Sequence, residues 1–176
     1  MTPLGSVFRD RSTRSMPSVI VHYHEIALKG RNRSWFVERL VSNIRMVTAD
    51  LGVTRVRALM GRIELRYGSE DAWTDLRERL ACTPGIANFS RAVRTRCDLD
   101  AITETVLTEL ADVQVESFRV TARRADKRFP VTSPELERQV GGRIKATRGW
   151  RVDLGRPELT VWVEMLSDEA FFSLLV

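Results

Sequence analysis

The feature that most constrains the fold is an alternation of two hydrophobic periods along the chain after residue 17. Apolar residues at every second position are typical of strands, and apolar residues three or four positions apart are typical of amphipathic helices. In the first half the pattern predicts, in order, a strand at 18–27, a helix from 32 or 34 to 51, hairpin strands at 55–60 and 62–67, a helix at 70–81 and a strand at 86–95. Gly52 is expected to end the first helix and Gly61 to turn the hairpin.

This order, strand-helix-strand-strand-helix-strand, is that of the ferredoxin-like fold. The second half predicts a helix at 99–111 capped by Asp98, a strand at 118–124, a helix at 133–148 begun by Ser133 and Pro134, and strands at 158–166 and 170–176. The fold class is therefore α+β, with a ferredoxin-like domain at 18–96 and an α-β-α-β-β domain at 97–176. Residues 1–17 are expected to be a flexible lead, in which Met16 is an alternative start to Met1.

The positive charge of the chain is concentrated in one stretch. Residues 118–151 contain ten Arg or Lys and three acids, a net charge of +7, whereas the whole chain carries +5, so the rest sums to −2. A localised positive field of this kind suits a polyanionic partner such as nucleic acid. A solvated basic face in an arginine-rich protein fits the charge alone equally well.

The predicted helix at 133–148 combines cations with two adjacent glycines. Projected at 100° per residue, Arg138, Gly142 and Lys145 lie opposite the apolar stripe, with Gly141 beside them. The stripe itself consists of Leu136, Val140 and Ile144. Glycine costs roughly 1 kcal/mol relative to alanine inside a helix. We interpret the pair as giving a sugar-phosphate backbone close access between the cations; close packing against another element is the alternative.

Further candidate RNA-binding residues surround this helix and the first predicted turn. Those near the helix are Arg123, Arg124, Lys127, Arg128 and Arg148, and those of the first half are Lys29, Asn32 and Arg33. Arginines beside a helix N-terminus are suited to phosphates. Phe129 and Trp150 could stack on bases, although core packing is favoured for both.

No catalytic or metal-binding signature is present, and no cofactor is predicted for this chain. No Walker loop, dinucleotide-binding loop or nucleophile elbow occurs. Cys82 and Cys97 have no zinc-ligand spacing and are expected to be reduced, in or near the core. The pair Glu135 and Glu137 is best explained as complementing the helix dipole. No apolar run is long enough to span a bilayer, which favours a cytoplasmic location.

Several segments together resemble the N-terminal half of the tRNA 4-thiouridine synthetase (tRNA sulfurtransferase, ThiI) family. The stretch Glu25 to Arg33 followed by Trp35 and Phe36 is similar to the opening strand, turn and helix of that family. Thr83 to Ile86 resembles the turn before its last ferredoxin-like strand. Resemblance to the THUMP domain of the family is found in four segments: 118–130, 133–142, 161–164 and 171–173.

The resemblance implies a ferredoxin-like domain followed by a THUMP domain, which together grip the acceptor stem and 3′ CCA end of tRNA. It also implies that a PP-loop domain uses ATP to adenylate the target uridine before a persulfide donates sulfur, and some members serve thiamine biosynthesis. The SGGxDS loop of the PP-loop domain occurs nowhere in the 176 residues. ATP binding and sulfur transfer are therefore not carried over to this chain.

The leading hypothesis is a tRNA-binding module of a 4-thiouridine synthetase, without catalytic residues of its own. Its expected partners are tRNA, a catalytic PP-loop domain or subunit and a sulfur donor, with no membrane; a homodimer is compatible with the sequence. Two alternatives remain open. One is a stand-alone THUMP adaptor that presents tRNA to another RNA-modifying enzyme, and the other is a basic module that binds an acidic protein.

Overall fold

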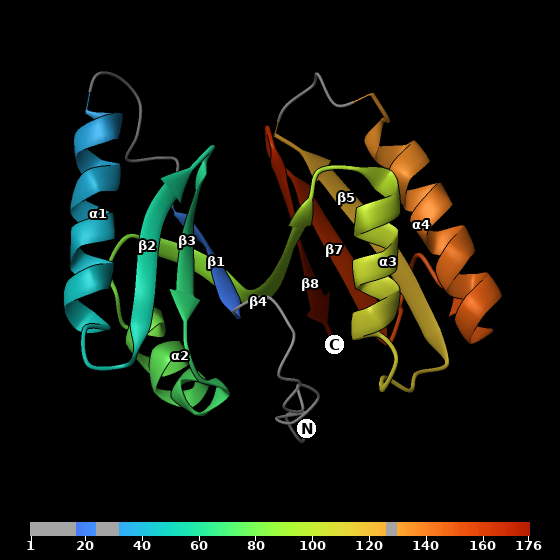
Figure 1. Ribbon diagram of the computed structural model, residues 1–176, viewed down its shortest axis with the longest axis horizontal. Coiled ribbons are helices and arrows are strands. Elements are labelled where there is room, and N and C mark those ends of the chain that lie inside the picture. The colour runs from blue at the N-terminus through green and yellow to red at the C-terminus, as the bar shows by residue number, and fades with distance from the viewer. Residues whose placement is uncertain (1–16, 24–31, 126–129) are drawn as a thin grey trace. The chain divides into compact units, whose positions relative to one another are not determined.

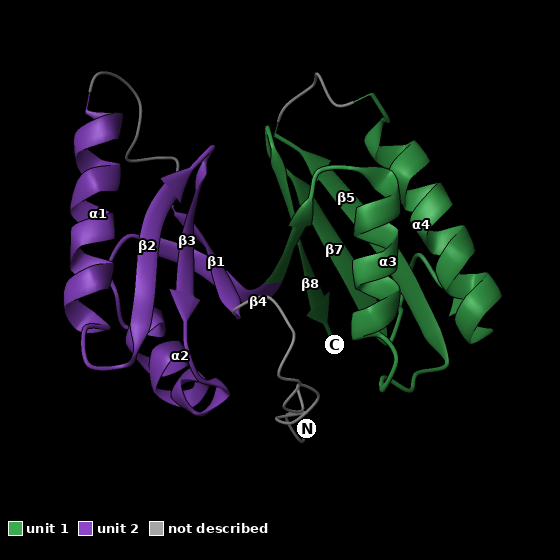
Figure 2. Cartoon of the chain, viewed as in Figure 1, with its two compact units in different colours: residues 1–14, 93–176 green, residues 15–92 purple. Residues whose placement is uncertain are grey.

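The computed structural model describes residues 17–23, 32–125 and 130–176. The predicted lead, the end of the first strand and the basic turn up to residue 31 lie outside the described residues. The chain divides into an N-terminal unit, residues 15–92, and a C-terminal unit, residues 93–176 (Figure 2). The two units are described separately below.

The N-terminal unit has the predicted order of elements. These are β1 (Ser18–Tyr23), α1 (Arg33–Val47), β2 (Val53–Leu59), β3 (Arg62–Tyr67), the 3-10 helix Glu70–Ala72, α2 (Trp73–Ala81) and β4 (Ile86–Arg96) (Figure 1). Their strands lie in the order β2-β3-β1-β4, and each neighbouring pair is antiparallel. The core forms where apolar residues of α1 and α2 pack on one face of this sheet. The expected ferredoxin-like arrangement is confirmed.

The first helix ends earlier than the apolar pattern predicts. The structure places its last residue at Val47 and its C-cap at Thr48, whose backbone N–H and hydroxyl both donate to the Ile44 carbonyl. Gly52 has a positive φ of 66°, but it lies in the turn before β2. The prediction that Gly52 ends the helix is wrong. The helix already ends at Thr48, because the Thr48 hydroxyl donates to the carbonyl of Ile44, one of the terminal carbonyls of the helix.

Among the described residues of the N-terminal unit, Glu64 is a carboxylate that is fully buried. Glu64 on β3 accepts hydrogen bonds from the guanidiniums of Arg57 and Arg66, the latter at 2.9 Å from Nε to Oε1, and from the Ser18 hydroxyl at 3.3 Å. Burial raises the pKa of Glu64, but the hydrogen bonds from Arg66 and Arg57 outweigh it and hold the pKa below its ordinary value. The carboxylate therefore stays charged inside the fold.

The C-terminal unit contains α3 (Leu99–Glu109), β5 (Ser117–Arg124), α4 (Ser133–Arg148), β6 (Arg151–Val152), β7 (Leu159–Met165) and β8 (Glu169–Leu175). The strand order is β8-β7-β5-β6, with β5 parallel to both β7 and β6 and β7 antiparallel to β8. The last residues of β4, Val93–Arg96, pair with β8. Apart from the short β6, the elements are those predicted.

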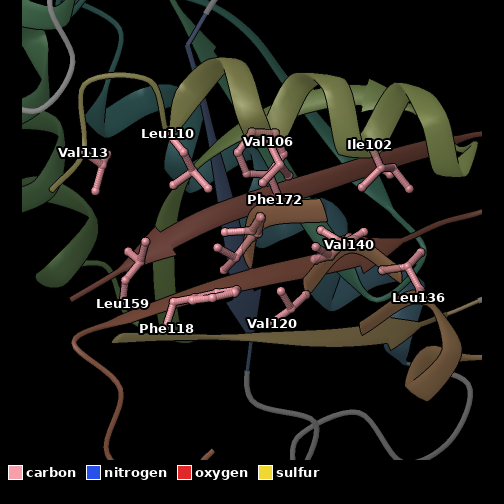
Figure 3. Packing of buried hydrophobic residues seen from close by; sticks show 14 of the residues in the cluster. Ile102, Val106, Leu110, Val113, Phe118, Val120, Leu136, Val140, Leu159 and Phe172 are labelled. Carbon is pink, nitrogen blue, oxygen red and sulfur yellow. The ribbon is translucent and has the colours of Figure 1, made fainter. Parts of the chain in front are cut away.

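The core of the C-terminal unit lies between its sheet and the helices α3 and α4. Figure 3 shows Val106 of α3 and Val140 of α4 directed toward Phe118 and Val120 of β5 and Phe172 of β8. Each of these five side chains is buried. The helices are thus held on one face of the sheet, and α4 is fixed beside β5.

The ends of α3 and α4 are capped by side chains. Asp98 accepts a hydrogen bond from the Ala101 N–H at 2.9 Å, as predicted. The cap of α4 is Thr132, whose hydroxyl accepts from the Glu135 N–H, whereas Ser133 is already helical. The prediction that Ser133 caps this helix is wrong, because Thr132 has the extended backbone that a cap requires.

Neither cysteine is in a disulfide. Cys97 is half-buried and packs against the core of the C-terminal unit, while Cys82 is exposed, so the expectation of a core position is wrong for Cys82. Within the described ranges, no group of three or more His, Cys, Asp or Glu could hold a metal ion. Among those same residues, no helix has both the length and the apolar character needed to cross a bilayer.

Candidate nucleic-acid interface

The outer side of α4 carries the cations predicted for it. Arg138 and Lys145 are exposed, with 73% of the Arg138 side chain accessible. Gly142 lies between them and is also exposed, and a Cβ built on it would meet nothing within 4 Å. These three residues follow one another at spacings of four and three, so they form a row on one side of the helix. We call this row the α4 outer face.

Gly141 does not belong to the α4 outer face. It is buried, and a Cβ built on it would lie 3.7 Å from Cγ2 of Val120 on β5. The interpretation of both glycines as bare surface is therefore wrong for Gly141, where the alternative of close packing holds. Gly142 alone leaves room for another molecule.

Gly141 is buried and Gly142 is exposed because Gly141 lies on the flank of α4 that faces β5. Glu137, Gly141 and Arg148 lie within about 40° of one another in projection at 100° per residue. The Glu137 carboxylate accepts a hydrogen bond from the Ala122 N–H of β5 at 2.7 Å. Glu137 lies beyond the first turn of the helix, so its main contact is with the strand and the explanation by the helix dipole fails for it.

Arg148 is held inside the unit. Its Nη2 donates to the Val113 carbonyl at 2.6 Å, and its guanidinium lies 5.0 Å from the ring centroid of Trp150. Trp150 is buried and stacks edge-on against Phe118, which confirms core packing for this tryptophan. The side chain of Arg148 is thus committed to the fold on the flank of α4, and it does not join the outer face.

Arg138 is paired with a carboxylate from its own helix. Its Nη2 and Nε donate to Glu135 at 2.6 and 3.0 Å, and Gln139 binds the same carboxylate. The hydrogen bonds from Arg138 and then Gln139 lower the pKa of Glu135, and the bond to Glu135 raises the pKa of Arg138. The pair is exposed, so a phosphate can exchange with Glu135 at little cost.

The end of β5 places two of the predicted arginines near the start of α4 in the chain. Arg123 is exposed, and Arg124 is half-buried with Nη1 donating to the Val131 carbonyl at 3.2 Å. Lys127, Arg128 and Phe129 lie outside the described residues. The contact between Glu137 and Ala122 ties this end of β5 to α4. Because Ala122 packs on the helix-covered face of the sheet and strand residues alternate, Arg123 lies on the opposite face and does not join the α4 outer face.

One exposed cation of α4 was not among the predicted site residues. Arg143 has 59% of its side chain accessible and bridges to Asp100 of α3, with 3.3 Å between Nη2 and Oδ1. It lies on the flank opposite Glu137, which the projection could have identified as solvent-facing. It is a third exposed cation of α4, beside Arg138 and Lys145.

In the N-terminal unit, the predicted residues Asn32 and Arg33 lie at the start of α1, and Lys29 is outside the described residues. Both described residues are exposed. Asn32 is the N-cap, but its side chain makes no capping hydrogen bond, and the first turn contains no acid. This helix end keeps the positive partial charge that attracts anions.

Comparison with known proteins gives two family matches along the chain. The family model for the ThiI ferredoxin-like domain matches residues 18–90, and the model for the THUMP domain matches residues 96–175. A probable tRNA sulfurtransferase from Alkaliphilus metalliredigens is 38% identical over 84% of this chain, and one from Thermus thermophilus is also 38% identical over 84%. The chain spans 38% and 36% of the lengths of these two relatives.

Solved structures show the same architecture. PH1313 from Pyrococcus horikoshii has a TM-score of 0.78 and 29% identity, over 91% of this chain and 54% of its own. A 4-thiouridine synthetase solved with RNA and ATP has a TM-score of 0.71 and 26% identity, over 92% of this chain and 41% of its own. With two family models matched in succession and the predicted fold observed in both units, the chain belongs to the ThiI family of tRNA sulfurtransferases, as its ferredoxin-like and THUMP region.

Proposed function

We propose that this chain binds the acceptor stem and 3′ CCA end of tRNA and presents the tRNA for uridine thiolation. The PP-loop domain or subunit that binds ATP, and the sulfur donor, lie outside the residues of this chain. Relatives named tRNA sulfurtransferase extend well beyond the matched region, which leaves room for such a domain. The chain itself contributes binding and orientation.

The observation that carries the proposal is the α4 outer face. Arg138 and Lys145 project from it on either side of Gly142, where no side chain obstructs a close approach. Phosphodiesters are bound by arginine and lysine side chains, and a backbone that comes close to a helix needs a surface without Cβ atoms.

The solved synthetase that was crystallised with RNA supports an RNA ligand for this pair of domains. The positive charge and the bare helix surface meet in the unit that matches the THUMP model.

The test is a comparison of tRNA with an otherwise identical RNA lacking the CCA end, over a series of salt concentrations. Binding through phosphates predicts that log K falls with log salt by about 0.7–0.9 per contact. The double variant Arg138→Ala with Lys145→Ala should bind tRNA more weakly and with a shallower salt slope, because it lacks two contacts. Fluorescence anisotropy of labelled RNA measures both quantities.

The matched control removes the same charge from exposed positions that are not part of the α4 outer face. Arg77 on α2 and Arg156 in the loop before β7 are both exposed, and their double alanine variant should lose much less affinity. If both double variants lost the same amount of tRNA affinity, the loss would be explained by the lower net charge of the protein. That result would contradict the proposed site. Equal affinity for RNA with and without the CCA end would contradict recognition of that end.

A further inference from the structure

Helix α1 carries an exposed tryptophan, Trp35, that is not part of the hydrophobic core. Trp35 is 64% accessible. The other three tryptophans of the chain have partners within their own units: Trp73 meets Phe89 and Arg91, Trp150 meets Phe118 and Arg148, and Trp162 donates to Glu164. Among the described residues, no hydrogen bond or ring contact engages Trp35. An exposed indole ring offers a free aromatic face, on which a planar group can stack.

The direction of Trp35 is set by its neighbour. Phe36 points inward, and its ring lies so close to Gly85 that a Cβ there would be 3.2 Å from it. Leu40, one turn further, is buried in the core. Successive helical residues are about 100° apart, so anchoring Phe36 and Leu40 turns Trp35 to the outer side of the helix. The exposure of the ring is therefore a property of how α1 packs.

A cation lies beside Trp35 on α1. Arg39 lies one turn further on the same side of the helix and is exposed. The first turn contains no acid, and Glu38, three positions after Trp35, is the one acidic residue of α1. An exposed aromatic ring next to a cation is the combination that binds single-stranded nucleic acid, the ring through a base and the cation through a phosphate.

We propose that Trp35 stacks on an unpaired base of the bound RNA and that Arg39 contacts the phosphate beside it. This inference rests on the proposed tRNA-binding function and adds a base-stacking residue in the N-terminal unit. Bases in a duplex are stacked on each other and offer no free face, so the occupant is a single-stranded segment. Trp35 then contributes to holding an unpaired segment, while the α4 outer face binds backbone phosphates.

The experiment measures binding of tRNA and of a short single-stranded RNA to the wild type and to Trp35→Ala. Stacking of a base on an aromatic side chain predicts about a five- to hundredfold loss of affinity in Trp35→Ala. Trp35→Phe retains a ring and should recover most of that loss. Met46→Ala is the matched control, since Met46 is 71% exposed on the same helix and should leave binding unchanged.

Intrinsic fluorescence supplies a second readout. Because Trp35 is the exposed tryptophan, acrylamide should quench it preferentially, and bound RNA should protect it; this protected component should vanish in Trp35→Phe. Unchanged affinity in Trp35→Ala, beside a clear loss in the variant lacking Arg138 and Lys145, would overturn this inference and leave the proposed function standing. Failure of the wild type to bind tRNA at all would overturn both. A blunt duplex that competes as well as the single strand would also overturn it.

Discussion

Substituting Gly142 by alanine should separate the stability of α4 from its binding function. Gly142 lies in the interior of the helix, has no positive φ, and has open space where a Cβ would be. Alanine is favoured over glycine there by about 0.8–1.0 kcal/mol. For a domain the size of the C-terminal unit, this gain corresponds to a rise of about 4–8 °C in the melting temperature.

The same methyl group should weaken RNA binding. It would stand between Arg138 and Lys145, where the proposal places a phosphate chain. Losing one hydrogen bond to a charged group costs about 1.5–3 kcal/mol, which is roughly a ten- to hundredfold loss of affinity. Gly142→Ala is therefore expected to be more stable and to bind more weakly, a combination that general damage to the fold cannot produce.

Calorimetry and RNA anisotropy on the same preparation measure the two effects. Gly141→Ala is the comparator, because its Cβ would meet Val120 at an ordinary contact distance of 3.7 Å on the side facing β5. It should gain similar stability and keep its affinity for RNA. If Gly142→Ala melts higher and binds tRNA as the wild type does, the argument that this glycine provides access is refuted.

Two further changes test the ion pairs. Glu135→Gln removes the carboxylate that competes for Arg138, so tRNA affinity should rise by a few-fold at most, because an exposed ion pair is weak; unchanged or weaker binding in a titration would argue against a contact by Arg138. Glu64→Gln removes the buried carboxylate that Arg57 and Arg66 bind, and should cost about 3–5 kcal/mol in urea unfolding. Because the folded pKa of Glu64 lies below its ordinary value of 4.5, the wild type should keep this stability above that value and lose it as the pH falls through the lower folded pKa. Glu64→Gln should lack this acid-dependent loss, and identical acid profiles would show that Glu64 is not the group responsible.

The order of elements could be predicted because each long helix and strand carries its own hydrophobic period. The two-residue strand β6, Arg151–Val152, was missed, since two residues cannot display a period. The end of α1 was misplaced because Leu51 continues the helical spacing although it belongs to the following turn. Thr132 and Ser133 are both good caps, and only the backbone geometry distinguishes them.

The candidate site was predictable where projection along a helix suffices. Arg138, Gly142 and Lys145 lie opposite the buried stripe, so their exposure follows from the sequence. Gly141 and Arg148 lie on a flank whose environment depends on where β5 runs, and that is a tertiary property. A long arginine side chain can reach back to a carbonyl such as that of Val113, which no local pattern reveals.

The hydrogen bond from the Ala122 N–H to Glu137 has a consequence for the behaviour of the protein in solution. Strand β6 pairs with β5 only at Ser117 and Phe118, so within the described chain the outer edge of β5 has no strand partner beyond that point. An edge of this kind is a template for strand addition by another molecule. The Glu137 carboxylate accepts the hydrogen bond of the Ala122 N–H on that edge, so this donor is not available to a strand of another molecule. Glu137 therefore disfavours edge-to-edge aggregation of the C-terminal unit.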